Sequence, residues 1–370
     1  MKIRIVAIFL LLFCGLSLQA QTLVDADATL ETKALYENLS KLAGKHVLFG
    51  QQDATNYGHS WSVGENRSDV KDVCGSHPAL VGDDFASLTM ANEERLKEEK
   101  KRLLKTITDT YGRGGVITIC WHCANPVNGG SFYYEKNPVR AVTEILPGGV
   151  GHQQYVIYLD RIAEVAHEAR GGAGELIPII FRPFHEFDGD WFWWGEQHCS
   201  KEEFIALWHF TINYLKNAKQ VHNFLYAFSP DCKFSSKEEY LERYPGDDFV
   251  DILGMDNYWD FRPDGANNPK LAEEKLKIVS DIAKDRHKLA ALTETGLEGI
   301  TNPEWYTDVL LPILKNPAIK LIYVAVWRNA NYNPAHYYAP FPGHPAESDF
   351  RKFKDDPQIY FEDQLPELYK

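Results

Sequence analysis

Long apolar runs are scarce in this chain of 370 residues, and the longest lies at its start. The first twenty residues combine a basic start, an apolar run over positions 5–18 and a small residue at Ala20, the pattern of a cleaved secretory signal. The run is short for a membrane span. We therefore expect residues 1–20 to be removed on export to the periplasm or the extracellular space. A lipid anchor on Cys14 is the weaker alternative, because the bulky Phe13 precedes it.

Basic residues are also few, with 39 Lys and Arg against 52 Asp and Glu. Loss of the leader would remove two basic residues and leave 37 against 52, a net charge of −15. Such an acidic surface repels phosphate backbones, which argues against a nucleic acid and favours a neutral or cationic partner. Aromatic residues, by contrast, make up 13% of the chain. Most of these rings are expected in the core, and stacking on sugars is a further use.

Cysteine is sparse: five remain after the leader, and an odd number leaves at least one thiol unpaired. The sequence CWHC, residues 120–123, superficially resembles a metal or redox pair. However, Cys120 belongs to an apolar strand in which neighbouring side chains alternate between faces. No second CxxC or HxxxH motif completes a zinc set. The sequence therefore predicts neither a metal nor a cofactor.

No low-complexity linker or short repeat divides residues 21–370, which favours a single domain over this range. Apolar, β-branched runs alternate with amphipathic helical patterns, as in a parallel α/β sheet. Eight strands are expected at 46–52, 79–85, 115–122, 176–186, 223–231, 251–259, 289–296 and 321–330. The clearest helical patterns cover 92–111, 153–169, 201–218 and 269–285.

Eight such units favour a closed (β/α)8 TIM barrel over an open doubly wound sheet, and no G-x-G-x-x-G fingerprint follows the first strand. The strands also begin apolar and end polar. Five of them end in Trp121-His122, His185-Glu186, Asp256-Asn257-Tyr258-Trp259, Glu294 and Trp327-Arg328. The carboxyl ends of barrel strands converge on one face, where active sites are built. We expect these groups to meet there.

Two of these strand ends carry carboxylates, Glu186 and Glu294. Opposed carboxylates are what glycoside hydrolysis requires, about 5 to 5.5 Å apart for retention or roughly 6.5 to 9.5 Å for inversion. The residues alone leave both outcomes open. The apolar surroundings of Glu186, with tryptophans over 191–194, favour a protonated general acid. Arg328 and the Tyr258 hydroxyl, expected beside Glu294, would keep it ionised as a nucleophile.

The segment RPFHEFDGDWFWWG resembles the acid/base segment of glycoside hydrolase family 26, in which a His precedes the catalytic Glu. The GQQ after the first strand, the Trp-His of the third, the Glu of the seventh and the VWRN of the eighth follow in matching order. The resemblance covers essentially all of residues 21–370. It implies a (β/α)8 barrel and a retaining mechanism, with β-1,4-mannanase as the commonest activity.

The resemblance also implies residue roles, with Glu186 as acid/base and Glu294 as nucleophile. The substrate-binding residues it implies are His122, His185, Trp191, Tyr258, Trp327 and Arg328, and Asp256 is either a further member of this set or a support for Arg328. The implied substrates are mannan, galactomannan, glucomannan and manno-oligosaccharides. A β-1,3-xylanase or mixed-linkage β-glucanase of the same family is one alternative, and a non-catalytic glycan-binding barrel is another.

Overall fold

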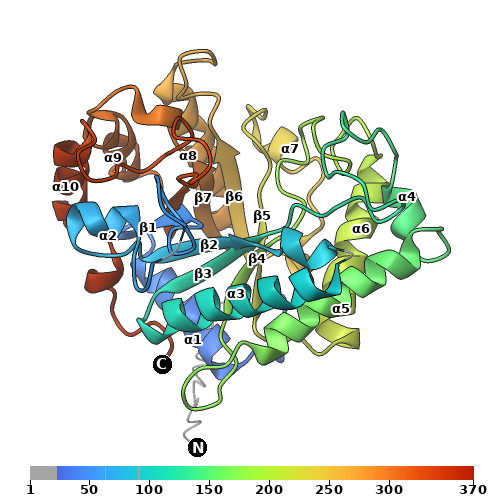
Figure 1. Ribbon diagram of the computed structural model, residues 1–370. Coiled ribbons are helices and arrows are strands. Elements are labelled where there is room, and N and C mark those ends of the chain that lie inside the picture. The colour runs from blue at the N-terminus through green and yellow to red at the C-terminus, as the bar shows by residue number, and fades with distance from the viewer. Residues whose placement is uncertain (1–22, 63, 91) are drawn as a thin grey trace, which may run out of the picture.

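The computed structural model describes residues 23–62, 64–90 and 92–370, so the expected leader over 1–20 and Cys14 lie outside it. Eight parallel strands form a closed barrel, because β1 pairs with both β2 and β8 (Figure 1). The strands are β1 (Val47–Gln52), β2 (Leu80–Asp84), β3 (Val116–Cys120), β4 (Ile179–Arg182), β5 (Phe224–Phe228), β6 (Ile252–Asn257), β7 (Leu289–Thr295) and β8 (Tyr323–Val326). Each lies within its predicted range, and the predicted fold is confirmed. A short ninth strand, β9 (Ile359–Tyr360), pairs with β1 outside the barrel.

Helices fill the connections between strands. They are α1 (Leu30–Leu42), α2 (Asp69–Cys74), α3 (Glu93–Gly112), α4 (Val142–Ile145), α5 (His152–Glu168), α6 (Lys201–Asn213), α7 (Lys237–Tyr240), α8 (Pro269–Asp285), α9 (Leu311–Leu314) and α10 (Glu347–Asp355). The four predicted helices correspond to α3, α5, α6 and α8, and α6 continues into a π-helical turn over Tyr214–Ala218. A second π-helical turn covers Trp305–Leu310, and short 3-10 turns cover Phe85–Thr89, Asp247–Phe249, Glu298–Ile300 and Glu362–Gln364.

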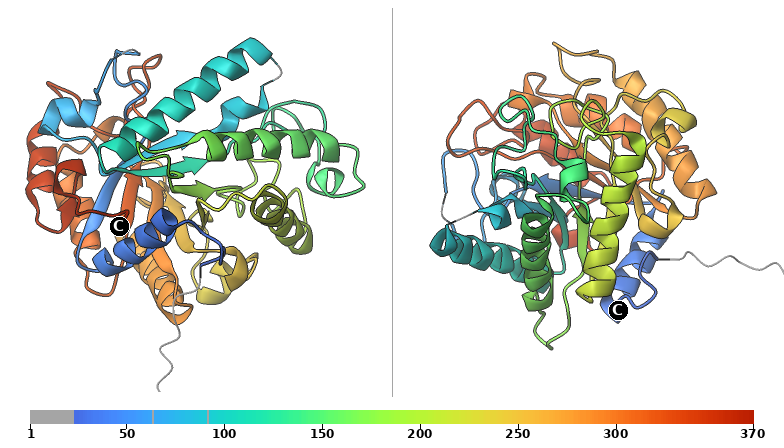
Figure 2. Two further views of the ribbon diagram at one scale, coloured as in Figure 1. Left: turned by 90° about the horizontal axis from the view of Figure 1, so that it is seen from below. Right: turned by 90° about the vertical axis from the view of Figure 1, so that its right-hand side faces the viewer.

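The barrel interior is packed by alternate strand residues. Leu48 and Ile180, for example, face the barrel interior and belong to one cluster with residues of α1. Their neighbours along the strands pack against the surrounding helices. Leu35 and Leu39 of α1 belong to the same inner cluster, so this helix closes the bottom of the barrel. The view from below shows α1 beside the C-terminal end of the chain (Figure 2). There, the side-chain amide of Asn38 donates a hydrogen bond of 3.0 Å to the backbone oxygen of Leu368. The opposite end, where the strands terminate, is left for polar groups.

Over the described ranges, no helix is long and apolar enough to cross a bilayer. The five cysteines there are all free thiols: Cys120, Cys123, Cys199 and Cys232 are buried and Cys74 is half-buried. Burial raises the pKa of each of these thiols.

Candidate active site

The carboxyl ends of the strands surround a cleft of about 910 Å³. It is lined by seven of the eight predicted site residues, namely His122, His185, Glu186, Trp191, Tyr258, Glu294 and Trp327. The eighth, Arg328, lies next to Trp327, with its guanidinium carbon 5.4 Å from the centre of the indole ring. Residues separated by more than 200 positions in the sequence are thus brought to one hollow.

A β-bulge aims Glu294 into this cleft. Along β7, Leu289 and Ala291 face the barrel interior, so strict alternation would turn Glu294 outward. The register between β6 and β7 shifts at this point, since Met255 pairs with Leu292 but Asp256 pairs with Glu294. The extra residue returns Glu294 to the inner side. Its side chain is buried, with 6% of the residue exposed.

Both oxygens of Glu294 receive hydrogen bonds. Arg182, at the end of β4, donates from Nη2 to Oε2 at 2.5 Å, and Tyr258 donates its hydroxyl to Oε1 at 2.8 Å. The expected contact with Tyr258 is confirmed. The expected contact with Arg328 is wrong, because the cation on Glu294 comes from a strand that faces it across the barrel. The carboxylate is therefore held in one orientation, as a nucleophile requires.

Arg182 also forms an ion pair with Asp256, on the inner side of β6. The alternative that Asp256 supports Arg328 is therefore wrong, because its partner is Arg182. Arg182 and Asp256 are buried, and a buried cation is tolerated only when its charge is compensated. The two carboxylates supply that compensation and hold the pKa of Arg182 well above its usual range, although burial by itself would lower it. Arg182 was missed as a site residue, although an arginine in the apolar strand IIFR was a signal of buried pairing.

Glu186 lies in a tight turn directly after β4. Its backbone adopts the left-handed region with φ of 53°, and so does that of Phe184 with φ of 50°. Such conformations are costly for residues other than glycine and cluster at functional sites. The turn is fixed by a hydrogen bond of 2.9 Å from the backbone N–H of Glu186 to the carbonyl of Ser229. The indole N–H of Trp191 then donates to Oε2 of Glu186 at 2.7 Å.

The surroundings of Glu186 favour its protonated form. Burial raises the pKa of its carboxyl well above the ordinary range, and the negative charges of Glu294 and Asp256 raise it further. The positive charge of Arg182 only partly opposes this effect. A carboxyl whose pKa is raised releases its proton less readily to water and is suited to donate it to a leaving oxygen. The expectation that apolar walls disfavour ionisation of Glu186 agrees with this direction.

His185 is a neutral imidazole in this environment. Burial, together with the positive charge of Arg182 and the neighbouring imidazole of His122, holds its pKa well below the usual range. Its Nδ1 atom has no hydrogen-bond partner among the residues that the structure describes. The rings of His185 and His122 pack edge to face, with centroids 4.6 Å apart. Both imidazoles are therefore presented to the cleft by neighbouring strands.

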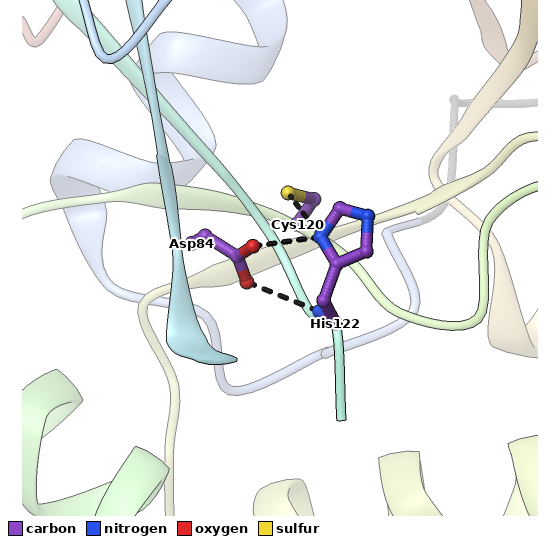
Figure 3. A group of neighbouring side chains, drawn as sticks. All are labelled: Asp84, Cys120 and His122. Atoms are coloured by element: carbon purple, nitrogen blue, oxygen red, sulfur yellow. Dashed lines mark hydrogen bonds and ion pairs between the residues drawn. The ribbon is translucent and has the colours of Figure 1, made fainter. Parts of the chain in front are cut away.

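Asp84, at the end of β2, orients His122. It accepts hydrogen bonds from Nδ1 at 2.7 Å and from the backbone N–H at 3.1 Å (Figure 3). Burial would raise the pKa of Asp84, but its contacts with His122 outweigh burial and lower it. This arrangement fixes the imidazole tautomer and leaves Nε2 for a ligand.

Two groups of three side chains have donor atoms close enough to share a metal ion. They are Asp84, Cys120 and His122 in one group and His185, Asp256 and Glu294 in the other. In the first, the carboxylate and imidazole already bond to each other; in the second, Arg182 supplies the positive charge. The two cysteines of the CWHC motif do not share a ligand set, because the thiol of Cys123 contacts the carbonyl of Ala124 instead. We therefore assign no metal-dependent step to either group.

Arg328 is anchored by two tyrosines. Its Nη2 donates to the hydroxyl of Tyr332 at 3.0 Å and its Nη1 to that of Tyr57 at 3.5 Å. The Tyr57 hydroxyl in turn donates to Asp53 at 2.6 Å. Asp53 is buried, and burial together with the charge of Asp83 raises its pKa to about 6. Sequence patterns did not identify this support, because Asp53 and Tyr57 lie in the loop after β1 and Tyr332 lies in the loop after β8.

The sequence profile of glycosyl hydrolase family 26 matches residues 24–328. The chain belongs to this family. A solved family 26 structure from Muricauda sp. is 41% identical, with a TM-score of 0.88 over 94% of this chain and 96% of that one. A family 26 β-mannanase from Bacteroides ovatus is 40% identical, with a TM-score of 0.84 over 92% and 98% of the two chains. The resemblance derived from the motifs is thereby confirmed.

Among characterised relatives, a mannan endo-1,4-β-mannosidase of Bifidobacterium adolescentis is 35% identical over 352 residues, which are 90% of this chain but 34% of that protein. A mannan endo-1,4-β-mannosidase of Bacillus subtilis is 27% identical over 88% of both chains. The chain thus spans about a third of the length of the first of these relatives.

Proposed function

We propose that this family 26 chain is a mannan endo-1,4-β-mannosidase that acts by double displacement. Glu186 protonates the leaving oxygen and later activates water, while Glu294 attacks the anomeric carbon. The observation that carries the proposal is the contrast between two carboxyls in one cleft. Glu186 has a raised pKa, whereas Glu294 receives hydrogen bonds from Arg182 and Tyr258 on its two oxygens. This is the division that acid and nucleophile require.

The remaining cleft residues are proposed to bind the sugar at the reacting carbon. His122, oriented by Asp84, and His185 offer imidazole nitrogens to hydroxyl groups, and Trp327 offers an apolar wall. Trp191 contacts the acid and faces the cleft, so it is placed to pack on the sugar beside the scissile bond. Arg328 is proposed to bind hydroxyls further along the glycan. The similarity to two mannan endo-1,4-β-mannosidases supports mannan as the polymer.

Variants of the two glutamates test the roles. Glu294→Ala should lose hydrolysis of mannan, and azide should restore cleavage of an aryl glycoside by taking the place of the carboxylate. Glu186→Ala should lose activity on mannan but retain formation of the covalent intermediate from an aryl glycoside with a good leaving group. Normal hydrolysis by Glu294→Ala, or a failure of azide to rescue it, would contradict the nucleophile assignment.

Substrate class is tested by one reducing-sugar assay on galactomannan, glucomannan, β-1,3-xylan and mixed-linkage β-glucan. Activity on xylan or glucan alone would contradict the mannanase proposal. Tight oligosaccharide binding without turnover by the intact chain would instead support a non-catalytic glycan-binding barrel. Early products of many sizes from linear mannan would support endo action. We also propose export, which the removal of residues 1–20 from secreted protein would test.

A further inference from the structure

Trp259 is a large aromatic side chain left exposed inside the cleft. It is 47% exposed and lines the same hollow as Glu186. Tyr133 is the other exposed aromatic residue of this lining, but it stacks on Phe192, with ring centroids 5.6 Å apart. In the part of the chain that the structure describes, no aromatic ring packs on Trp259. Its apolar surface is therefore available to a ligand.

The segment that carries Trp259 is held rigidly. The next residue, Asp260, is fully buried and accepts hydrogen bonds from Asn257 at 2.7 Å and Lys275 at 2.8 Å. The carbonyl of Trp259 itself accepts a hydrogen bond of 2.8 Å from the N–H of Ala266, which closes the loop. A preorganised aromatic group loses little conformational freedom when a ligand binds. This rigidity distinguishes Trp259 from an aromatic residue exposed on a mobile surface loop.

One face of the indole is covered by a cation. The guanidinium carbon of Arg262 lies 5.0 Å from the ring centroid of Trp259, and Arg262 also lines the cleft. Arg262 is paired in turn with the exposed Asp264 at 3.4 Å. The arrangement covers one face of the ring and leaves the other for a ligand, while the guanidinium donors of Arg262 belong to the same cleft lining. An apolar platform with hydrogen-bond donors in the same lining fits the apolar face and peripheral hydroxyls of a pyranose ring.

The position of Trp259 indicates which part of the glycan it meets. Glu186 follows β4, and β4, β5 and β6 are adjacent in the barrel, so the cleft wall on this side is formed by Trp191 and Lys233, after β4 and β5, and by Trp259, after β6. Because an acid protonates the oxygen of the leaving group, the leaving group lies on the acid's side of the scissile bond. We propose, on the basis of the proposed function, that Trp259 is the stacking platform for a hexopyranose of the leaving group. Binding there makes the length of the leaving group a determinant of rate.

The test compares two substrates that share a glycone and differ in the leaving group. The leaving group of linear mannohexaose is a chain of mannose units, whereas the leaving group of para-nitrophenyl β-mannotrioside is only nitrophenol. Trp259→Ala should lower kcat/KM on mannohexaose about tenfold and change that on the aryl glycoside by less than about twofold. Trp259→Phe should restore most of the lost rate because it retains a flat apolar face. Leu30→Ala removes an apolar side chain that is 80% exposed on α1 below the barrel, and it serves as the matched control.

Equal losses on both substrates would overturn the proposal, since they would place Trp259 on the glycone side or in the support of Glu294. Unchanged rates on both substrates in Trp259→Ala would overturn it as well. Thermal unfolding and circular dichroism of each variant identify a loss of rate caused by misfolding. If Trp259→Ala misfolds, the two substrates are compared with Trp259→Phe instead. A wild-type protein that cleaves neither substrate would reject the proposed function, which is a separate result.

Discussion

Trp191 donates its indole N–H to Oε2 of Glu186 at 2.7 Å, so the aromatic wall of the cleft also contacts the proposed acid directly. A hydrogen bond to a carboxylate favours its charged form and lowers its pKa. Trp191 therefore opposes, in part, the effects of burial and neighbouring charges that raise the pKa of Glu186. The final value is a balance, and it can be shifted from either side.

Trp191→Phe should raise the pKa of Glu186, because the donor is lost while an aromatic face remains. The alkaline limb of the kcat/KM profile on mannan reports this acid in the free enzyme, so it should move to higher pH. The measurement is a profile from pH 4 to pH 10 in constant ionic strength. An alkaline limb that stays in place or moves to lower pH would contradict the role of this contact.

Gly189 makes the same contact possible by leaving room for the ring. A Cβ atom added at Gly189 would lie 2.5 Å from two atoms of the Trp191 indole, closer than real Cβ contacts allow. Gly189→Ala should therefore displace Trp191 and shift the alkaline limb in the same direction as Trp191→Phe. Gly112→Ala is the matched control, because a Cβ there meets nothing within 4 Å. An unshifted profile in Gly189→Ala would show that the Trp191 ring moves but keeps its hydrogen bond to Glu186.

Arg182 compensates two buried carboxylates, and its loss should be severe. Arg182→Met should lower the free energy of unfolding by about 3 to 5 kcal/mol, the usual effect of removing one partner of a buried ion pair. Urea denaturation measures this change. Arg351→Met removes a half-exposed arginine that pairs with Glu347, and it should cost less than about 1 kcal/mol. Equal stability of the two variants would refute the compensating role.

Asp53 links stability to pH. Its pKa is raised to about 6 in the folded protein, against about 3.9 in an unfolded chain. The folded state therefore binds the proton more tightly, and this group costs stability as the pH rises from about 4 to about 6. Asp53→Asn removes that cost. Between about pH 4 and about pH 6, the free energy of unfolding should therefore fall by about 2 kcal/mol less in this variant than in wild type.

Asp264→Asn is the control for Asp53→Asn, because its carboxylate is 79% exposed and is expected to show no such difference. Urea denaturation at pH 4, 5, 6 and 7 gives the comparison. Parallel stability curves for wild type and Asp53→Asn would contradict the raised pKa. A separate rise in KM for Asp53→Asn would indicate that Tyr57 transmits the change to Arg328.

The sequence by itself determined the order of strands and helices, because apolar runs and amphipathic helical patterns are local properties of the chain, and eight such units favour a barrel. It also determined which strands end in polar groups, and hence that Glu186 and Glu294 share one face. Only the tertiary structure decided which groups touch. Arg182, rather than Arg328, reaches Glu294, and a bulge in β7 turns that carboxylate inward. Strand register, barrel closure and the turn that carries Glu186 depend on contacts across the whole molecule, and these have no local signature in the chain.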